Sequence, residues 1–198
     1  MADTLFADVS EFQVPVNDQY PYKFLSIRSN DGTYRDKHFA QNYTWAKTAL
    51  ASGRLTGLIV YFVWHPNWQD AVNTHTSMCG GKPHPKQATM IDVESWGGKI
   101  TGNQSTGINA ARAALVKWYG GDKRRVIGYG NAGDLTSLWP SRGDIGIVLA
   151  NYSSNPAFPG KVAHQFSDKQ STAPFGPCDI NSADGRSPAQ FATQLGLA

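Results

Sequence analysis

Cysteine is scarce in this sequence of 198 residues, which contains only two, and this excludes a fold held together by a disulfide framework. Long hydrophobic runs are also missing. The longest, residues 57–64, is far shorter than the ~20 residues that cross a membrane as a helix. The first residues lack the basic start and apolar stretch of a secretory signal. We therefore expect no membrane partner and no signal peptide.

Positive charge is not concentrated along the chain. Eighteen basic residues stand against fifteen acidic ones, and only residues 123–125 form a compact basic run, which we interpret as an exposed turn. Nucleic acid is not an expected partner, because proteins that bind it gather Lys and Arg on one element. The sequence also lacks the Gly-x-Ser-x-Gly turn of serine hydrolases and a glycine-rich phosphate loop.

Aromatic residues, by contrast, are plentiful, at 12% of the chain with six Trp and eight Tyr. Such side chains suit a groove in which sugar rings stack, and they suit a hydrophobic core equally well. Composition alone leaves both roles open.

Short apolar runs recur along the chain and predict the strands of one sheet. They are nearly continuous rather than alternating, which is typical of parallel strands buried on both faces. There are seven such runs and a weaker eighth, at residues 5–9, 24–27, 57–63, 89–93, 125–129, 145–150, 162–166 and, for the eighth, 178–181.

Helices are predicted between some of these strands. Residues 36–52 and 105–118 carry Ala, Leu and Trp at helical spacing, and Ser187 followed by Pro188 marks the start of a third helix, which closes the fold. The segments after the sixth and seventh strands are too rich in Asn, Ser, Pro and Gly for helices. We therefore predict a single α/β domain, residues 1–198. Its fold is an irregular TIM-like barrel with eight strands, fewer than eight helices and loops between the last strands.

Four carboxylates lie at or near predicted strand ends, where barrels of this type carry their functional residues. They are Asp8, Asp92, Glu94 and Asp179. The first and eighth strands become neighbours when the barrel closes. The spacing of two places Asp92 and Glu94 on one face, with backbones about 6.7 Å apart.

Paired carboxylates at this scale are typical of glycoside hydrolysis. One protonates the leaving oxygen, and the other stabilises the developing cation or activates a nucleophile. Crowding and desolvation raise the pKa of at least one such group, and Glu94, with the longer reach, is our candidate acid. The pattern alone also fits carboxylates that cap a helix or pair with arginines.

Five separated motifs resemble those of the family 25 glycoside hydrolases, the muramidases that include many phage endolysins. Residues 8–13 read Asp-Val-Ser-Glu-Phe-Gln, similar to the opening signature of that family, and residues 34–42 space Tyr, Asp, Phe and Asn as in the segment that opens its first full helix. Three later stretches also resemble family motifs: Met-Ile-Asp-Val-Glu at 90–94, His-Gln-Phe-Ser at 164–167 and Phe-Gly-Pro-Cys-Asp-Ile-Asn at 175–181.

The resemblance implies hydrolysis of the β-1,4 bond between N-acetylmuramic acid and N-acetylglucosamine, with the peptidoglycan glycan strand as partner and no cofactor or metal. Carried over position by position, Glu94 would be the general acid and Asp92 the carboxylate that steadies an intermediate, by a covalent or a substrate-assisted route. Asp8 and Asp179 would hold the substrate and tune the other two. The resemblance also implies a monomeric, bacteriolytic phage endolysin that stays in the host cytoplasm until it is released to the cell wall.

The chain departs from the family pattern along the predicted saccharide groove. The third strand keeps only the Tyr of the usual Gly-Ala-Tyr-His-Phe, and residues 28–32 and 148–152 replace two other common stretches. These departures favour a second hypothesis, a non-catalytic module that binds cell-wall glycan on the same barrel. The candidates for sugar contact are Tyr61, Tyr129, Tyr152, Gln165 and Asp31, with packing as the alternative for the aromatic ones.

A third hypothesis, an amidase or peptidase acting on the peptide stem, needs a metal or a Cys–His pair. His75, Cys79 and His84 are too few for a structural zinc site, and we interpret them as part of a surface loop. A disulfide between Cys79 and Cys178 is not predicted, because endolysins are made in a reducing cytoplasm.

Overall fold

The computed structural model describes residues 3–197, and its centre is a closed barrel of eight strands. Closure occurs at β1 (Leu5–Val9), which pairs with β2 (Phe24–Asp31) on one side and β9 (Gly176–Ser182) on the other. The remaining barrel strands are β4 (Gly57–Val63), β5 (Gln87–Asp92), β6 (Val126–Asn131), β7 (Gly146–Ala150) and β8 (Lys161–Thr172). The short β3 (Tyr34–Arg35) pairs with the end of β2.

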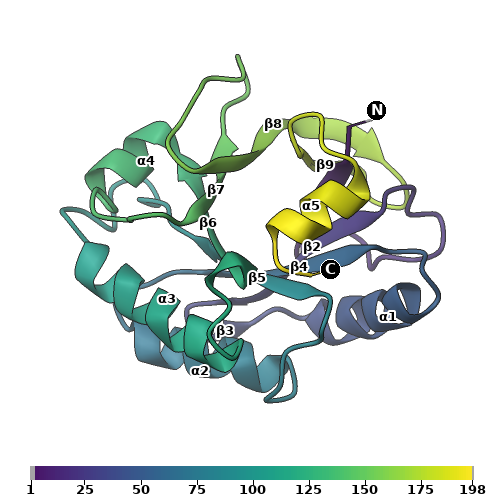
Figure 1. The fold of residues 1–198 in the computed structure, drawn as a ribbon, viewed down its shortest axis with the longest axis horizontal. Coiled ribbons are helices and arrows are strands. Elements are labelled where there is room, and N and C mark those ends of the chain that lie inside the picture. Colours follow the sequence, from purple (N-terminus) through teal and green to yellow (C-terminus); the bar gives the residue numbers. More distant parts are fainter. Residues whose placement is uncertain (1–2, 198) are drawn as a thin grey trace.

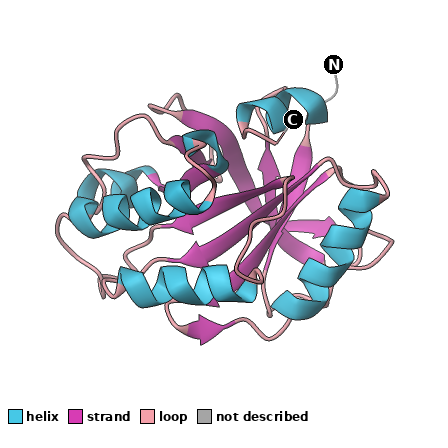
Figure 2. Cartoon of the chain, turned by 60° about the horizontal axis from the view of Figure 1, so that its bottom comes forward, coloured by secondary structure: helices cyan, strands magenta, loops and turns pink. Residues whose placement is uncertain are grey.

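Neighbouring strands of the barrel are parallel from β1 to β8, whereas β9 runs antiparallel to both β8 and β1. The carboxyl ends of the parallel strands therefore meet at one rim. The helices lie on the outside of the strands (Figures 1 and 2). They are α1 (Phe39–Ala51), α2 (Trp68–Met78), α3 (Ser105–Trp118), α4 (Ala132–Ser137) and α5 (Pro188–Gln194), with one turn of 3-10 helix, η1, at Lys123–Arg125.

The last helix, α5, closes the opposite end of the barrel. It begins with the predicted cap, in which Ser187 accepts a hydrogen bond from the backbone of Gln190 and Pro188 occupies the first turn. The ring of Phe191 lies 4.9 Å from Phe24 and 5.6 Å from Phe6, centre to centre, at the start of their strands. This end of the barrel is filled by side chains, whereas the carboxyl rim is open.

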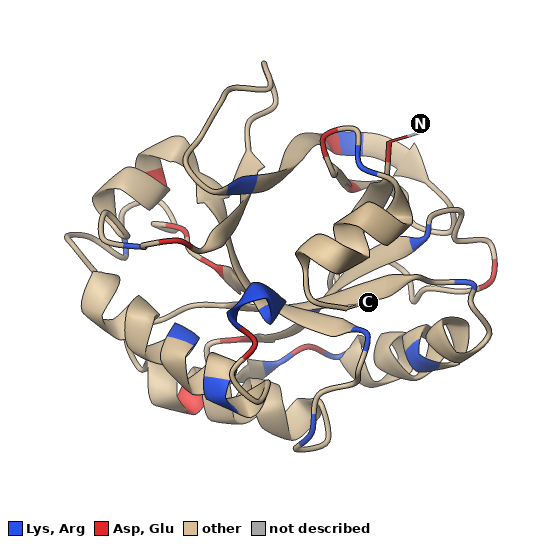
Figure 3. Ribbon diagram, in the orientation of Figure 1, with Lys and Arg blue, Asp and Glu red and all other residues tan. Residues whose placement is uncertain are grey.

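Basic residues are spread over several helices, loops and strands (Figure 3). Lys123 and Arg124 of η1 are exposed, as predicted for a turn. Arg125 is partly buried instead, and its Nε donates a hydrogen bond of 2.9 Å to the backbone oxygen of Gln87. Among residues 3–197, no helix is both long enough and apolar enough to span a bilayer.

Two predictions about segments are wrong. His75, which we predicted to lie in a surface loop with Cys79 and His84, belongs to helix α2 and is completely buried, and Cys79 directly after the helix is buried as well. The helix was missed because it is mostly polar and buries only a narrow stripe, Ala71, Val72 and His75. The last two strands are joined by a hairpin rather than a long loop, because β8 continues to Thr172 and pairs with β9. Both cysteines are buried free thiols.

Candidate active site

The four predicted carboxylates converge on one pocket at the open rim of the barrel. Asp8 and Asp179 are direct partners in the antiparallel β1–β9 pair, Asp92 ends β5, and Glu94 follows two residues later. All four line a pocket of about 170 Å³, together with Tyr61, Tyr129, Gln165, Arg28, Ser10, Phe12, Val63, Met90 and Trp96. The closure of the barrel thus joins residues that are far apart in the sequence.

Burial and mutual repulsion raise the pKa of every one of these acids. The pKa values of Asp8 and Asp92 lie well above the usual range, and desolvation is the largest cause for both. The next cause is the charge of Asp179 for Asp8, and the charge of Glu94 for Asp92. Burial, with the charges of Asp134 and Asp179, raises the pKa of Glu94 to about 6. Burial and the charge of Asp168 raise the pKa of Asp179 to about 6 as well. The pocket therefore retains protons that free carboxyl groups would have lost.

One oxygen of Asp92 is left without a partner. Its Oδ1 is buried and makes no hydrogen bond within residues 3–197. An unsatisfied buried polar atom is unfavourable, and more so when it carries charge, which agrees with the raised pKa of Asp92.

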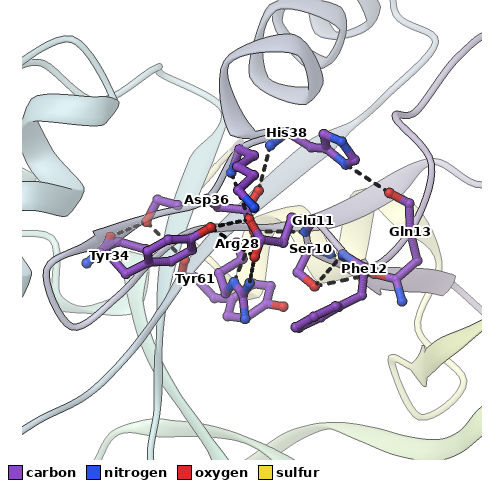
Figure 4. A network of polar contacts seen from close by, with 12 residues as sticks. Ser10, Glu11, Phe12, Gln13, Arg28, Tyr34, Asp36, His38 and Tyr61 are labelled. Atoms are coloured by element: carbon purple, nitrogen blue, oxygen red, sulfur yellow. Dashed lines mark hydrogen bonds and ion pairs between the residues drawn. The ribbon is translucent and has the colours of Figure 1, made fainter.

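The one cationic group that lines this pocket among the described residues, Arg28, is held by acids from two other segments (Figure 4). Its Nε donates to Asp36 Oδ2 at 3.0 Å, and its Nη2 lies 3.9 Å from Glu11 Oε1. The Phe12 ring lies 5.3 Å from the guanidinium carbon, although the ring itself is 79% exposed. Tyr34 completes this group by donating to Glu11 Oε2 at 2.8 Å.

This cluster of Arg28, Glu11, Phe12, Tyr34 and Asp36 was not predicted as part of the site. Glu11 and Phe12 belong to the opening motif, and this is the signal that could have indicated them. Arg28 itself appeared only as a departure from a common pattern, because its contacts depend on the fold: Arg28 is in β2, Asp36 lies just before α1, and Glu11 is in the β1–β2 loop.

The opposite wall is built around Gln165, which is almost completely buried. Its side-chain oxygen accepts hydrogen bonds from Tyr129, at 2.7 Å, and from Tyr152, at 2.9 Å. Tyr129 is largely buried, whereas Tyr152 is 53% exposed and lines a second cavity of about 290 Å³ with Glu94, Tyr129 and Asn131.

Asp31 lies apart from the carboxylate pocket. It lines a third cavity, of about 370 Å³, in which its Oδ1 is 2.6 Å from His65 Nε2. Trp96, which sequence reasoning did not select, lines both this cavity and the carboxylate pocket. Of the five predicted sugar contacts, Tyr61, Tyr129 and Gln165 thus line the central pocket, and Tyr152 and Asp31 line its two neighbours. Within residues 3–197, no group of three or more His, Cys, Asp or Glu side chains is arranged to hold a metal ion.

Comparison with solved structures shows the fold. The chain superposes on a family 25 glycosyl hydrolase from Bacillus anthracis with a TM-score of 0.76 and 16% identity, covering 96% of this chain and 92% of that one. The TM-score is 0.73 for a bacterial lysozyme from Streptomyces coelicolor, at 19% identity and full coverage of both chains. It is also 0.73 for the catalytic domain of endolysin ply40 from bacteriophage P40 of Listeria monocytogenes, at 17% identity and 98% coverage of both. The predicted irregular barrel is therefore confirmed.

Comparison with the sequences of curated proteins shows which family the chain belongs to. No protein-family model matches the chain. The chain is 50% identical over 208 aligned positions to the uncharacterized protein Rv3766 of Mycobacterium tuberculosis, and the match covers all of this chain and 75% of that protein. The chain belongs to the same family as Rv3766, and its fold is that of the family 25 glycosyl hydrolases.

Proposed function

We propose that this protein is a peptidoglycan muramidase, which hydrolyses the β-1,4 bond between N-acetylmuramic acid and N-acetylglucosamine. The observation that carries the proposal is the convergence of Asp8, Asp92, Glu94 and Asp179 on one partly buried pocket. The fold, shared with lysozymes and muramidases, supports the same substrate class.

Glu94 is the general acid in this proposal. Its pKa of about 6 means that it carries a proton in weakly acidic solution and gives it up to the oxygen of the breaking bond. Water then supplies the hydroxyl group of the new reducing end, and its remaining proton returns to Glu94. Asp134 and Asp179 contribute to this behaviour, because their negative charges favour the protonated form.

Asp92 is the carboxylate that steadies the positive charge of the sugar. Burial and the charge of Glu94 raise its pKa and favour the neutral form. Asp92 acts in its ionised form, after its proton has passed to solvent, and the positive charge of the developing oxocarbenium ion stabilises this carboxylate.

The cavities on both sides of the central pocket favour a polymer over a single sugar. Glu94 and Tyr129 are shared with the Tyr152 cavity, and Trp96 is shared with the Asp31 cavity, so the three form neighbouring parts of one surface. A polymeric substrate bound across the carboxylates therefore reaches both neighbouring cavities.

The test is the release of new reducing ends from purified cell walls. We expect Glu94→Gln to lower this rate by at least about a hundredfold while the circular dichroism spectrum is unchanged. The matched control, Asp70→Asn on the outer helix α2, keeps the parent rate. Lysis by Glu94→Gln at the parent rate contradicts the assignment of the acid. Tight binding of walls by the parent without any product favours the non-catalytic module instead.

A further inference from the structure

The Asp31 cavity carries charged groups that the sugar backbone of the proposed substrate does not match. It is lined by Asp31 from the end of β2, His65 and Pro66 after β4, and Trp96, Lys99 and Ile100 after β5. These segments follow three neighbouring parallel strands, so the cavity belongs to the same rim as the carboxylate pocket. In peptidoglycan the lactyl carboxyl group of N-acetylmuramic acid is joined to the peptide stem by an amide bond, so the glycan part presents hydroxyl and amide groups without charge.

The acidic part of the cavity is rigidly built. Asp31 and His65 are joined at 2.6 Å, and the imidazole ring lies against the backbone of Gly32, where a Cβ atom would be only 3.0 Å from His65 Cδ2. Gly32 has a φ of +55° and donates from its amide to the oxygen of Val63 at 3.1 Å. The turn after β2 therefore fixes the position of this carboxylate and imidazole.

The basic part lies on the loop after β5. Lys99 is exposed, and its ammonium group makes no ion pair within residues 3–197. Trp96, which separates the cavity from the carboxylate pocket, has a φ of +50°, a conformation that a bulky residue adopts only when its surroundings enforce it. The amide of Ser95 donates to Asp134 Oδ2 at 3.1 Å, and the amide of Ile100 donates to the oxygen of Ser95 at 3.1 Å. These bonds anchor the loop on both sides of Trp96.

The cavity on the other side of the carboxylates has a different chemistry. Apart from Glu94, its walls are the phenol groups of Tyr129 and Tyr152, the amides of Asn131 and Asn151, and Ala150. Such groups suit an uncharged sugar ring, which they can contact by stacking and by hydrogen bonds. The two ends of the cleft are therefore suited to different parts of a ligand.

We propose that the Asp31 cavity binds the peptide stem of peptidoglycan, while the carboxylate pocket and the Tyr152 cavity bind the glycan. This inference rests on the proposed function and names the part of the substrate that the site selects. A peptide stem carries carboxylate groups, which Lys99 attracts, and amino groups, which Asp31 attracts. Trp96, Pro66 and Ile100 provide apolar surface for its aliphatic side chains.

The experiment compares glycan strands that carry peptide stems with the same strands after an amidase has removed the stems. The lactyl carboxylate that the amidase exposes is capped as a methyl amide, so that the stripped strands gain no new charge. The quantity is the ratio of kcat/KM on the two substrates. We expect Lys99→Met and Asp31→Asn each to lower this ratio about tenfold, because each removes one charge-assisted contact to the stem. Lys117→Met, on the exposed face of α3, keeps the parent ratio. The ratio isolates the stem, because any effect of Asp31 on nearby Asp92 changes both rates alike.

A binding measurement keeps the inference separate from the proposed function. In the Glu94→Gln background, which does not consume the substrate, calorimetry with both kinds of strand gives the affinity directly. If stem-bearing strands bind more tightly, and Lys99→Met abolishes this difference, the cavity is supported as a peptide site. This conclusion holds even if the parent cleaves neither substrate, because failure to cleave overturns only the proposed muramidase activity. Equal affinity for both strands, or an equal loss of affinity for both, shows that the cavity holds no stem and overturns the inference.

Discussion

At the scale of single residues, the pKa of Glu94 predicts how activity depends on pH. The acid must be protonated to act, and its pKa is raised to about 6 by burial, Asp134 and Asp179. We therefore expect kcat/KM to fall as pH rises through about 6. Asp134→Asn removes one of the negative charges that raise the pKa of Glu94, so the alkaline limb of the pH–activity profile of this variant moves to lower pH. A plot of initial rate against pH measures both effects.

The control for this prediction is Asp70→Asn, which removes an acidic charge from α2 and leaves the limb in place. A purely structural role for Asp134 would lower the rate at all pH values without moving the limb. Such a result contradicts the electrostatic explanation, as does a limb that moves to higher pH.

The residues of the central pocket differ in how far they could be predicted. Asp8, Asp92, Glu94 and Asp179 were found because they lie at or near strand ends and within recognisable motifs, and the structure places them together. Asp134 was not found, because it lies on the short α4 and reaches the site only through the fold. Side chains that act through space over a few ångströms leave no pattern in the order of residues.

At the scale of elements, helix α2 depends on a buried histidine. His75 lies 2.8 Å from Ser29 Oγ through Nδ1 and 2.9 Å from Thr89 Oγ1 through Nε2, which connects α2 to β2 and β5. Burial lowers the pKa of His75 to about 3, so the ring is neutral. Sequence periodicity could not reveal this helix, because a polar side chain buried through hydrogen bonds looks like a surface residue in the sequence.

We expect His75→Ala to lower the free energy of unfolding by about 3 kcal/mol, since it leaves a cavity and two buried hydroxyl groups short of a partner. This loss corresponds to a decrease of about 6–12 °C in Tm for a chain of this length. His84→Ala, on a partly exposed side chain outside α2, changes stability by less than about 0.5 kcal/mol. Thermal unfolding followed by circular dichroism compares the two. Similar small losses in both variants contradict a structural role for the His75 contacts.

At the scale of the whole molecule, the barrel could be predicted because its strands are continuous apolar runs in a simple order. Closure between β1 and β9 follows from that order, and the cap of α5 from Ser187 and Pro188. The antiparallel hairpin of β8 and β9 could not, because its polar residues 167–172 have the composition of a loop. The closure that completes the barrel is also what brings Asp8 opposite Asp179.

This gathering of acids makes the folded protein less stable as pH rises. The pKa values of Glu94 and Asp179 are about 6 in the folded state, against ordinary values of 4.5 and 3.8. Between about pH 4 and 6 the folded state therefore binds more protons than the unfolded state, and the free energy of unfolding decreases as pH rises through this window. This loss of stability is absent below about pH 4 and complete above about pH 6, where both carboxyl groups are charged although partly buried.

Asp179→Asn tests this relation between the site and stability. The variant keeps the shape of the side chain but removes its charge, so we expect the free energy of unfolding at pH 7 to rise by on the order of 1 kcal/mol, after allowance for partial exposure to solvent. Urea unfolding at pH 5 and pH 7 measures the effect, which is larger at pH 7. The same variant loses activity if Asp179 holds the substrate, so stability and catalysis change in opposite directions. Equal stability of parent and variant at pH 7 contradicts this explanation, because the charge of Asp179 would then not destabilise the folded state.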